Sequence, residues 1–145
     1  MNKQLLAALA IFTFATAAHA QMTPVGTWHT IDDKTNEVKT EVVISESGGV
    51  VTGKITKLLR KGANQEAVCD KCSDDRKGKA ILGMEIIREV RKVDGKEVWE
   101  GGKVLDPESG SLYSVRLTPI EGGKKLEMRG SFAFISRTQT WVRVP

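Results

Sequence analysis

Hydrophobic and polar residues alternate along most of the chain after residue 24. In residues 38–46, Val42 and Ile44 fall on one face, while Glu41 and Ser45 fall on the other. A period of two residues is typical of a β-strand with one buried face. Patterns of this kind predict eight strands, at residues 25–31, 38–46, 50–59, 84–93, 96–105, 112–118, 126–134 and 138–144.

Turn residues separate these segments at fairly regular intervals. Asp94-Gly95 is the strongest hairpin signal, because a type I′ turn needs positive φ at both central residues. Two further turns are marked by Gly48-Gly49 and by the Pro-containing run at residues 106–110. Nearly every connection is short, so we expect each strand to pair with the next along the chain. The sequence therefore predicts an all-β domain, either an antiparallel up-and-down barrel or a sandwich.

Two segments fit this scheme less well. In residues 81–93, Ile86, Val90 and Val93 also follow helical spacing, so a helix stays open as an alternative to the strand. Residues 60–79 form one long polar connection that contains both cysteines. Glycines inside or beside the strands predict a strongly bent sheet, as at barrel corners, and they are Gly26, Gly53, Gly83, Gly101, Gly102 and Gly130.

The first twenty residues differ from the rest of the chain. Lys3 precedes an apolar run over residues 5–18, and Ala18-His19-Ala20 supplies the small residues of a cleavage site. The run is shorter than the roughly 20 residues of a bilayer span, so a retained membrane anchor is the weaker alternative. We expect residues 1–20 to be a signal peptide and residues 21–145 (145 − 20 = 125 residues) to be one exported domain, periplasmic or secreted, with no membrane span after cleavage.

Charge is nearly balanced in the expected mature chain. Loss of Lys3 leaves 22 − 1 = 21 basic residues against 18 acidic residues, a net charge of +3. The densest basic run, at residues 76–79, has no aromatic residues interleaved with it. A nucleic-acid groove needs both a concentrated basic face and stacking platforms. Nucleic acid is therefore not expected as a partner.

No sequence typical of an enzyme or a cofactor site is present. The expected mature part has one histidine, His29, and no Gly-x-Ser-x-Gly motif, so a catalytic triad has no support. Phosphate-binding loops are absent, and residues 32–37 resemble a calcium loop only in their acids, because Lys34 stands where a ligand is needed. We expect a non-enzymatic protein with no catalytic residue, cofactor or metal.

Cys69 and Cys72 form the sharpest local motif. Two cysteines this close in an exported protein are expected to form a disulfide with each other. The first interpretation is a structural clip for the long connection. A redox-active pair would need an activating helix N-terminus, and a zinc site would need two further ligands, which one distant histidine does not supply. Both stay open as alternatives, as do free thiols.

Aromatic residues are spread over five of the predicted strands. They are expected to fill the core, and a lining for a cavity in a barrel mouth is the functional alternative. An eight-stranded barrel either fills its interior with side chains or holds one small ligand. The set comprises Trp28, Trp99, Tyr113, Phe132, Phe134 and Trp141.

Short motifs over nearly the whole expected mature chain carry a family resemblance. The specific ones are Gly101-Gly102-Lys103-Val104-Leu105-Asp106-Pro107-Glu108-Ser109-Gly110 and Arg137-Thr138-Gln139-Thr140-Trp141, accompanied in order by Val25-Gly26-Thr27-Trp28, Gly53-Lys54-Ile55, the cysteine pair and Tyr113. The chain resembles a bacterial family of secreted domains of unknown function, the one numbered 2147. The resemblance implies a small lipocalin-like β-barrel over residues 21–145, and no catalytic or ligand-binding residues come with it. One departure is the run Ser131-Phe132-Ala133-Phe134, where a second glycine is expected soon after Gly130.

An even number of up-and-down strands makes the first and last strands antiparallel neighbours. Pairing them middle to middle sets Trp28 opposite Trp141 and places Arg143 diagonal to Trp28 on the same face. A guanidinium there can stack on the indole. The lipocalin resemblance also implies a Trp–Arg pair that closes one end of the barrel, with Arg137 as the second candidate if the register shifts. We expect this pair to be a structural plug and not a ligand site.

The leading functional interpretation is a binding protein that holds a small apolar or amphipathic molecule in a barrel cavity. The alternative is a structural or interaction module of the envelope, with a filled barrel whose surface binds another envelope protein. Cavity volume distinguishes the two. A lined pocket of roughly 300 Å³ or more supports ligand binding, and a packed interior supports the interaction module.

Overall fold

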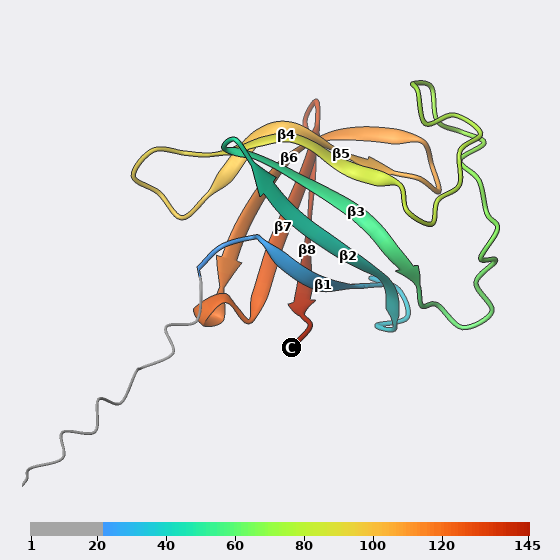
Figure 1. The fold of residues 1–145 in the computed structure, drawn as a ribbon, viewed down its shortest axis with the longest axis horizontal. Helices are drawn as coiled ribbons and strands as arrows, with labels where there is room; N and C mark the ends of the chain where they lie inside the picture. The colour runs from blue at the N-terminus through green and yellow to red at the C-terminus, as the bar shows by residue number, and fades with distance from the viewer. Residues whose placement is uncertain (1–21) are drawn as a thin grey trace, which may run out of the picture.

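The structure is a computed structural model that describes residues 22–145. The signal peptide expected at residues 1–20 lies outside the described residues. Figure 1 shows the strands wrapped around a common interior, with the long connection between β3 and β4 at the right of the view.

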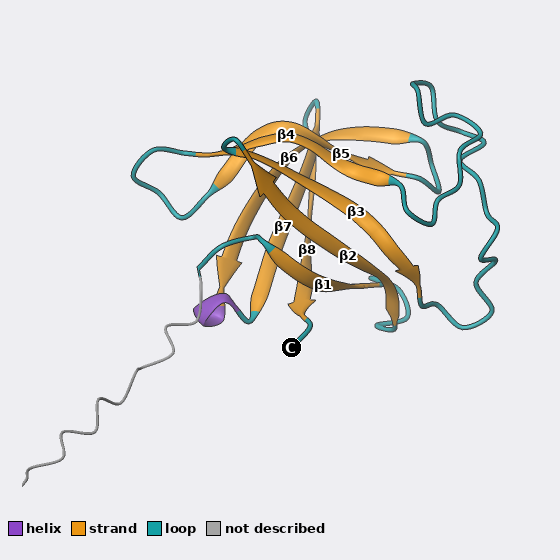
Figure 2. Cartoon of the chain, in the orientation of Figure 1, coloured by secondary structure: helices purple, strands orange, loops and turns teal. Residues whose placement is uncertain are grey.

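Eight strands follow one another along the chain, and each is antiparallel to the next. β1 also pairs with β8, so the sheet closes on itself. The predicted eight-stranded up-and-down barrel is confirmed, and the sandwich alternative is wrong. Figure 2 separates the strands from their connections. The elements are β1 (Gly26–Ile31), β2 (Val38–Ser47), β3 (Val50–Leu58), β4 (Glu85–Lys92), β5 (Trp99–Asp106), β6 (Ser111–Ile120), the short 3₁₀ turn η1 (Glu121–Gly123), β7 (Lys125–Phe132) and β8 (Ile135–Arg143).

The barrel interior holds one continuous apolar core. Trp28, Trp99 and Trp141 are all buried in it, whereas Phe132 and Phe134 are exposed. The prediction that the aromatic residues fill the core is therefore wrong for both phenylalanines. The strand residues of the core include Val42, Ile44, Val51, Ile55, Ile87, Val90, Leu105, Val115, Leu117 and Leu126.

Within residues 22–145, no helix has the length and apolar character needed to cross a membrane.

Along part of its pairing with β3, β4 contains one extra residue. Val51 pairs with Val90 and Gly53 pairs with Ile87, so three residues of β4 span the distance covered by two of β3. Glu89 lies in this β-bulge with a φ of 59°. The bulge turns Ile87 and Val90 into the core although they are three residues apart. Apolar residues at that spacing imitate a helix, and the helix alternative for this segment is wrong.

The β7–β8 hairpin turns through Ala133 and Phe134, between the paired residues Phe132 and Ile135. Ala133 has a φ of 53°, in the left-handed region that glycine adopts most readily. The absence of a glycine after Gly130 is therefore accommodated by an alanine in the turn. The predicted seventh strand ran through this turn, because Phe134 continues the apolar pattern, and β8 begins three residues earlier than predicted.

Candidate ligand-binding pocket

Up-and-down topology places every second connection at the same end of the barrel. The connections at residues 32–37, 59–84, 107–110 and 133–134 share one end, which we call the mouth. The other end carries the N-terminal segment, η1 and the end of β8 and is called the closed end. The two ends differ in chemistry.

A pocket of about 870 Å³ opens at the mouth. This volume lies within the roughly 300–1,000 Å³ that is typical of small-molecule sites. Six apolar side chains from five strands line the inner part of the pocket, and each of the six is more than nine-tenths buried. The inner wall is therefore apolar, and it is formed by Ile55, Ile86, Val104, Leu105, Met128 and Trp141.

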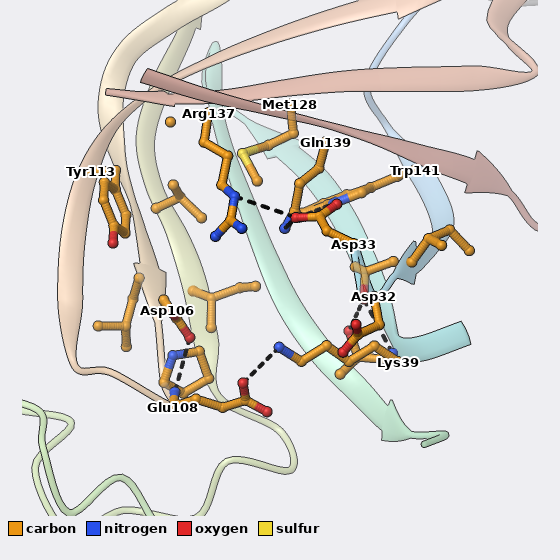
Figure 3. A pocket seen from close by; sticks show the side chains of 18 of the residues that line it. Asp32, Asp33, Lys39, Asp106, Glu108, Tyr113, Met128, Arg137, Gln139 and Trp141 are labelled. Carbon is orange, nitrogen blue, oxygen red and sulfur yellow. Dashed lines mark hydrogen bonds and ion pairs between the residues drawn. The ribbon is translucent and has the colours of Figure 1, made fainter. Parts of the chain in front are cut away.

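β8 adds a polar side to this wall (Figure 3). The Trp141 indole Nε1 donates to Gln139 Oε1 at 3.2 Å, and Gln139 Nε2 donates to Asp33 Oδ2 at 3.2 Å. Arg137 Nε lies 3.5 Å from the same carboxylate oxygen. A chain of polar contacts thus runs from a buried indole to a guanidinium at the mouth. The Arg137 side chain is 70% exposed, so its cation is accessible from the pocket opening.

Ion pairs fix the rim of the mouth. Arg60 donates to Asp32 Oδ2 at 2.6 Å and to Glu108 Oε1 at 3.0 Å, which ties the β1–β2 connection to the β5–β6 turn. The backbone N–H groups of Lys34 and Thr35 donate to Asp32 Oδ1 at 2.8 and 3.1 Å. These two bonds, with a further contribution from Arg60, hold the pKa of Asp32 below its ordinary value. The carboxylate therefore keeps its charge, and its hold on Arg60, below the pH at which a free aspartate is protonated.

Cys69 and Cys72 are joined by a disulfide, with their Cα atoms 5.5 Å apart. The loop that contains them packs against the β5–β6 turn. Cys69 Sγ lies 3.4 Å from the carbonyl oxygen of Pro107, and a side chain at Gly110 would collide with the carbonyl oxygen of Lys71. Neither cysteine lines the pocket. The disulfide thus lies outside the pocket lining, against the β5–β6 turn.

Replacing both cysteines with serine is expected to lower the free energy of unfolding by roughly 0–2 kcal/mol and to leave the fold intact. The closed ring is small, so its loss frees little chain entropy in the unfolded state. Urea unfolding of the variant and of the wild-type protein measures the difference. Disulfide-exchange activity in the wild-type protein that disappears in the variant would favour the redox-active alternative instead.

A cation–π contact occupies the closed end. The Arg143 guanidinium carbon lies 4.2 Å from the centroid of the Trp28 ring. Arg143 also donates to three backbone carbonyls: Nε to Gly123 at 2.6 Å, Nη1 to Val25 at 2.9 Å and Nη2 to Thr23 at 2.7 Å. Burial lowers the pKa of Arg143 from its ordinary value. One side chain therefore links the end of β8 to the N-terminal segment and to η1.

The predicted register of the β1–β8 pair is wrong by two residues. Trp28 lies directly opposite Arg143, and Trp141 lies opposite Leu126 of β7. The two strands pair only near the end of β8, so matching them at their middles placed Arg143 diagonal to Trp28. Arg137, the second candidate, lies at the mouth beside Asp33, at the other end of the barrel.

Few side chains in the described part of the chain are arranged for metal binding or catalysis. His29 Nε2 lies 3.6 Å from Glu41 Oε2 on β2, a single weak contact between neighbouring strands. Between residues 22 and 145, no group of three or more His, Cys, Asp or Glu side chains is arranged to hold a metal ion. The pocket is the feature with the clearest functional geometry.

Comparison with known proteins agrees with this fold. Residues 26–143 match the profile of a protein family described as "Uncharacterized protein conserved in bacteria (DUF2147)". No curated protein matches the chain. A similar solved structure is that of protein HP1028 from the human pathogen Helicobacter pylori, described as belonging to the lipocalin family. Its TM-score is 0.70 and its sequence identity 20%, over 83% of this chain and 82% of that one. This likeness shows the fold and confirms the lipocalin-like barrel.

Proposed function

The chain belongs to the bacterial DUF2147 family of uncharacterised proteins, and from this premise and the lipocalin-like barrel we propose that it is a non-enzymatic binding protein. Its ligand is a small apolar or amphipathic molecule held in the mouth pocket. The observation that carries the proposal is the pocket itself, about 870 Å³ with an apolar inner wall. A filled barrel, on which the alternative of a purely structural envelope module depends, would have no such space.

The arrangement of the pocket favours an amphipathic ligand oriented with its polar end outward. Each methylene group placed against Val104, Met128 or Trp141 contributes about 0.8 kcal/mol of apolar burial. A polar end left at the mouth meets Arg137 and the rim charges. A ligand whose polar end stays at the rim buries no unpaired charge in the pocket. The desolvation cost of binding is therefore low.

Export of the protein is part of the same proposal. Residues 1–20 have the composition of a signal peptide, and the Cys69–Cys72 disulfide is of a kind that persists in oxidising compartments. Inside that compartment the disulfide serves as a structural clip for the β3–β4 connection. The Trp28–Arg143 contact serves as a plug at the closed end, opposite the ligand.

Native mass spectrometry of protein purified from its own cell envelope tests this function. We expect a polypeptide that starts at Gln21, because Ala18 and Ala20 occupy the small-residue positions of the cleavage site. We also expect an additional mass from a co-purifying small molecule that is lost on denaturation. A polypeptide that retains Met1 would contradict export. Exported protein that carries no such molecule, and takes up no amphipathic probe, would contradict ligand binding.

A further inference from the structure

Three large apolar side chains are exposed together at the tip of the β7–β8 hairpin. Phe132, Phe134 and Ile135 have relative exposures of 66%, 105% and 72%. Among the large apolar residues that the structure describes, Val68 comes next at only 41%. We call Phe132, Phe134 and Ile135 the apolar tip. Soluble proteins rarely gather such side chains in water unless they meet a partner there.

The apolar tip continues the inner wall of the pocket beyond the mouth. Phe132 pairs with Ile135 across the hairpin, and two residues further down Gly130 pairs with Arg137. Residues two apart on a strand share a face, so Phe132 and Ile135 stand above Gly130 and Arg137, both of which line the pocket. Ile135 lines the pocket as well. Figure 1 shows this hairpin as a narrow projection at the top of the view.

The hairpin that carries the tip is positively charged. No Asp or Glu occurs from Arg129 to the last residue of the chain. Arg129 and Arg137 stand on the two strands just below the tip, with Arg129 Nη2 donating to Ser136 Oγ at 3.0 Å. Exposed phenylalanines above a pair of arginines match a bilayer surface that has apolar chains beneath anionic headgroups. A second copy of the same hairpin would instead bring like charges together.

We propose that the apolar tip docks the barrel mouth onto the surface of an anionic lipid bilayer. The phenylalanines enter the headgroup region, and Arg129 and Arg137 lie at the level of the lipid phosphates. The mouth then faces the membrane, so that an amphipathic molecule could pass between bilayer and pocket along Ile135. Docking does not require a ligand, and it stands or falls separately from the binding function proposed above.

Flotation with lipid vesicles tests the docking. The chain from Gln21 onward is used, because the apolar run at residues 5–18 would itself bind lipid, and because the barrel closes within residues 26–143. Binding to vesicles of phosphatidylglycerol and phosphatidylethanolamine is expected to exceed binding to phosphatidylcholine alone and to weaken with salt. Phe132→Ser with Phe134→Ser is expected to weaken vesicle binding at least about tenfold. Arg129→Gln is expected to weaken it about fivefold.

Two control variants keep the test specific. Val142→Thr removes an exposed apolar side chain from the same strand at the closed end, and Met128→Trp obstructs the pocket. Both are expected to bind vesicles as the wild-type protein does. Phe134→Trp adds an exposed indole to three buried ones, and its emission is expected to shift to the blue on anionic vesicles.

Four results would overturn the proposal. One is wild-type protein that stays unbound on anionic vesicles. Another is a doubly substituted tip that binds them equally well. The third is a wild-type dimer in sedimentation that the tip substitutions convert to a monomer without any vesicle binding, since this would make a second copy the partner. The fourth is loss of vesicle binding in folded Met128→Trp protein, because docking through the apolar tip does not use the pocket.

Discussion

Replacing Arg143 with alanine is expected to lower the free energy of unfolding by about 2–4 kcal/mol. The guanidinium donates three hydrogen bonds to backbone carbonyls of the N-terminal segment and η1. It also lies on the Trp28 indole, which is completely buried beneath it. Alanine removes the donors from three carbonyls and opens the indole to water. Urea unfolding followed by tryptophan emission measures the loss, and the native emission is expected to shift to the red.

Matched variants separate the causes of that loss. Arg143→Lys keeps the positive charge but has no planar fork to reach three carbonyls, so an intermediate loss is expected. Arg137→Ala removes a guanidinium from the same face of β8 at the mouth, where an exposed ion pair contributes only about 0–1 kcal/mol. Folded Arg143→Ala protein should still take up a probe at the mouth. An Arg143→Ala protein as stable as the wild-type protein would contradict the plug at the closed end.

Local signals in the sequence predict the strands and their next-neighbour order, whereas the choice of a barrel over a sandwich comes from the family resemblance. Alternation and turn residues located all eight strands, because each strand has one buried and one exposed face and most connections are short. The segment around Glu89 shows where this kind of signal fails. A single left-handed residue moves the apolar positions from two apart to three apart, and a strand with such a bulge has the same pattern as a helix.

The exposed hairpin shows a second failure of pattern. Phe132 and Phe134 have the spacing of buried strand residues, so alternation predicts a core position for both. Both phenylalanines are exposed instead, because the β7–β8 hairpin extends beyond the mouth and they lie at its tip. The residue pattern predicts that a strand is present here. How far β7 and β8 extend beyond the barrel mouth depends on where the neighbouring strands end, which the pattern does not show.

The candidate site could be predicted only in outline. That an eight-stranded barrel holds a ligand is one of two interpretations that the sequence leaves open. Of the six aromatic residues that are the alternative cavity lining, only Tyr113 and Trp141 line the pocket. The residues that line the pocket come from all eight strands and from three connections, and contacts such as that between Asp33 and Gln139 join residues that are far apart in the sequence. The inward position of Arg137, Gln139 and Trp141 does follow from alternation on β8. The position of each residue along the barrel depends on the register between neighbouring strands. The register predicted for β1 and β8 is wrong by two residues.

Replacing Met128 with tryptophan is expected to weaken the binding of anilinonaphthalene sulfonate about thirtyfold. This probe combines apolar rings with one anionic group, and so it resembles the proposed class of ligand. Met128 projects from β7 into the apolar part of the pocket and is almost fully buried there. If the larger indole excludes about three carbon groups of the probe from the wall, roughly 2 kcal/mol of apolar burial is lost, which corresponds to a factor of about thirty.

The substitution uses space that the pocket already contains, so thermal unfolding is expected to change little. Met128→Leu conserves volume and apolar character, and it is expected to bind the probe within about threefold of the wild-type protein. Because the probe can also adhere to exposed phenylalanines, the whole series is measured in a background that carries Phe132→Ser and Phe134→Ser. Binding confined to the pocket survives those tip substitutions and is lost on Met128→Trp. A Met128→Trp protein that is folded and still binds the probe with wild-type affinity would place the ligand somewhere other than the mouth pocket.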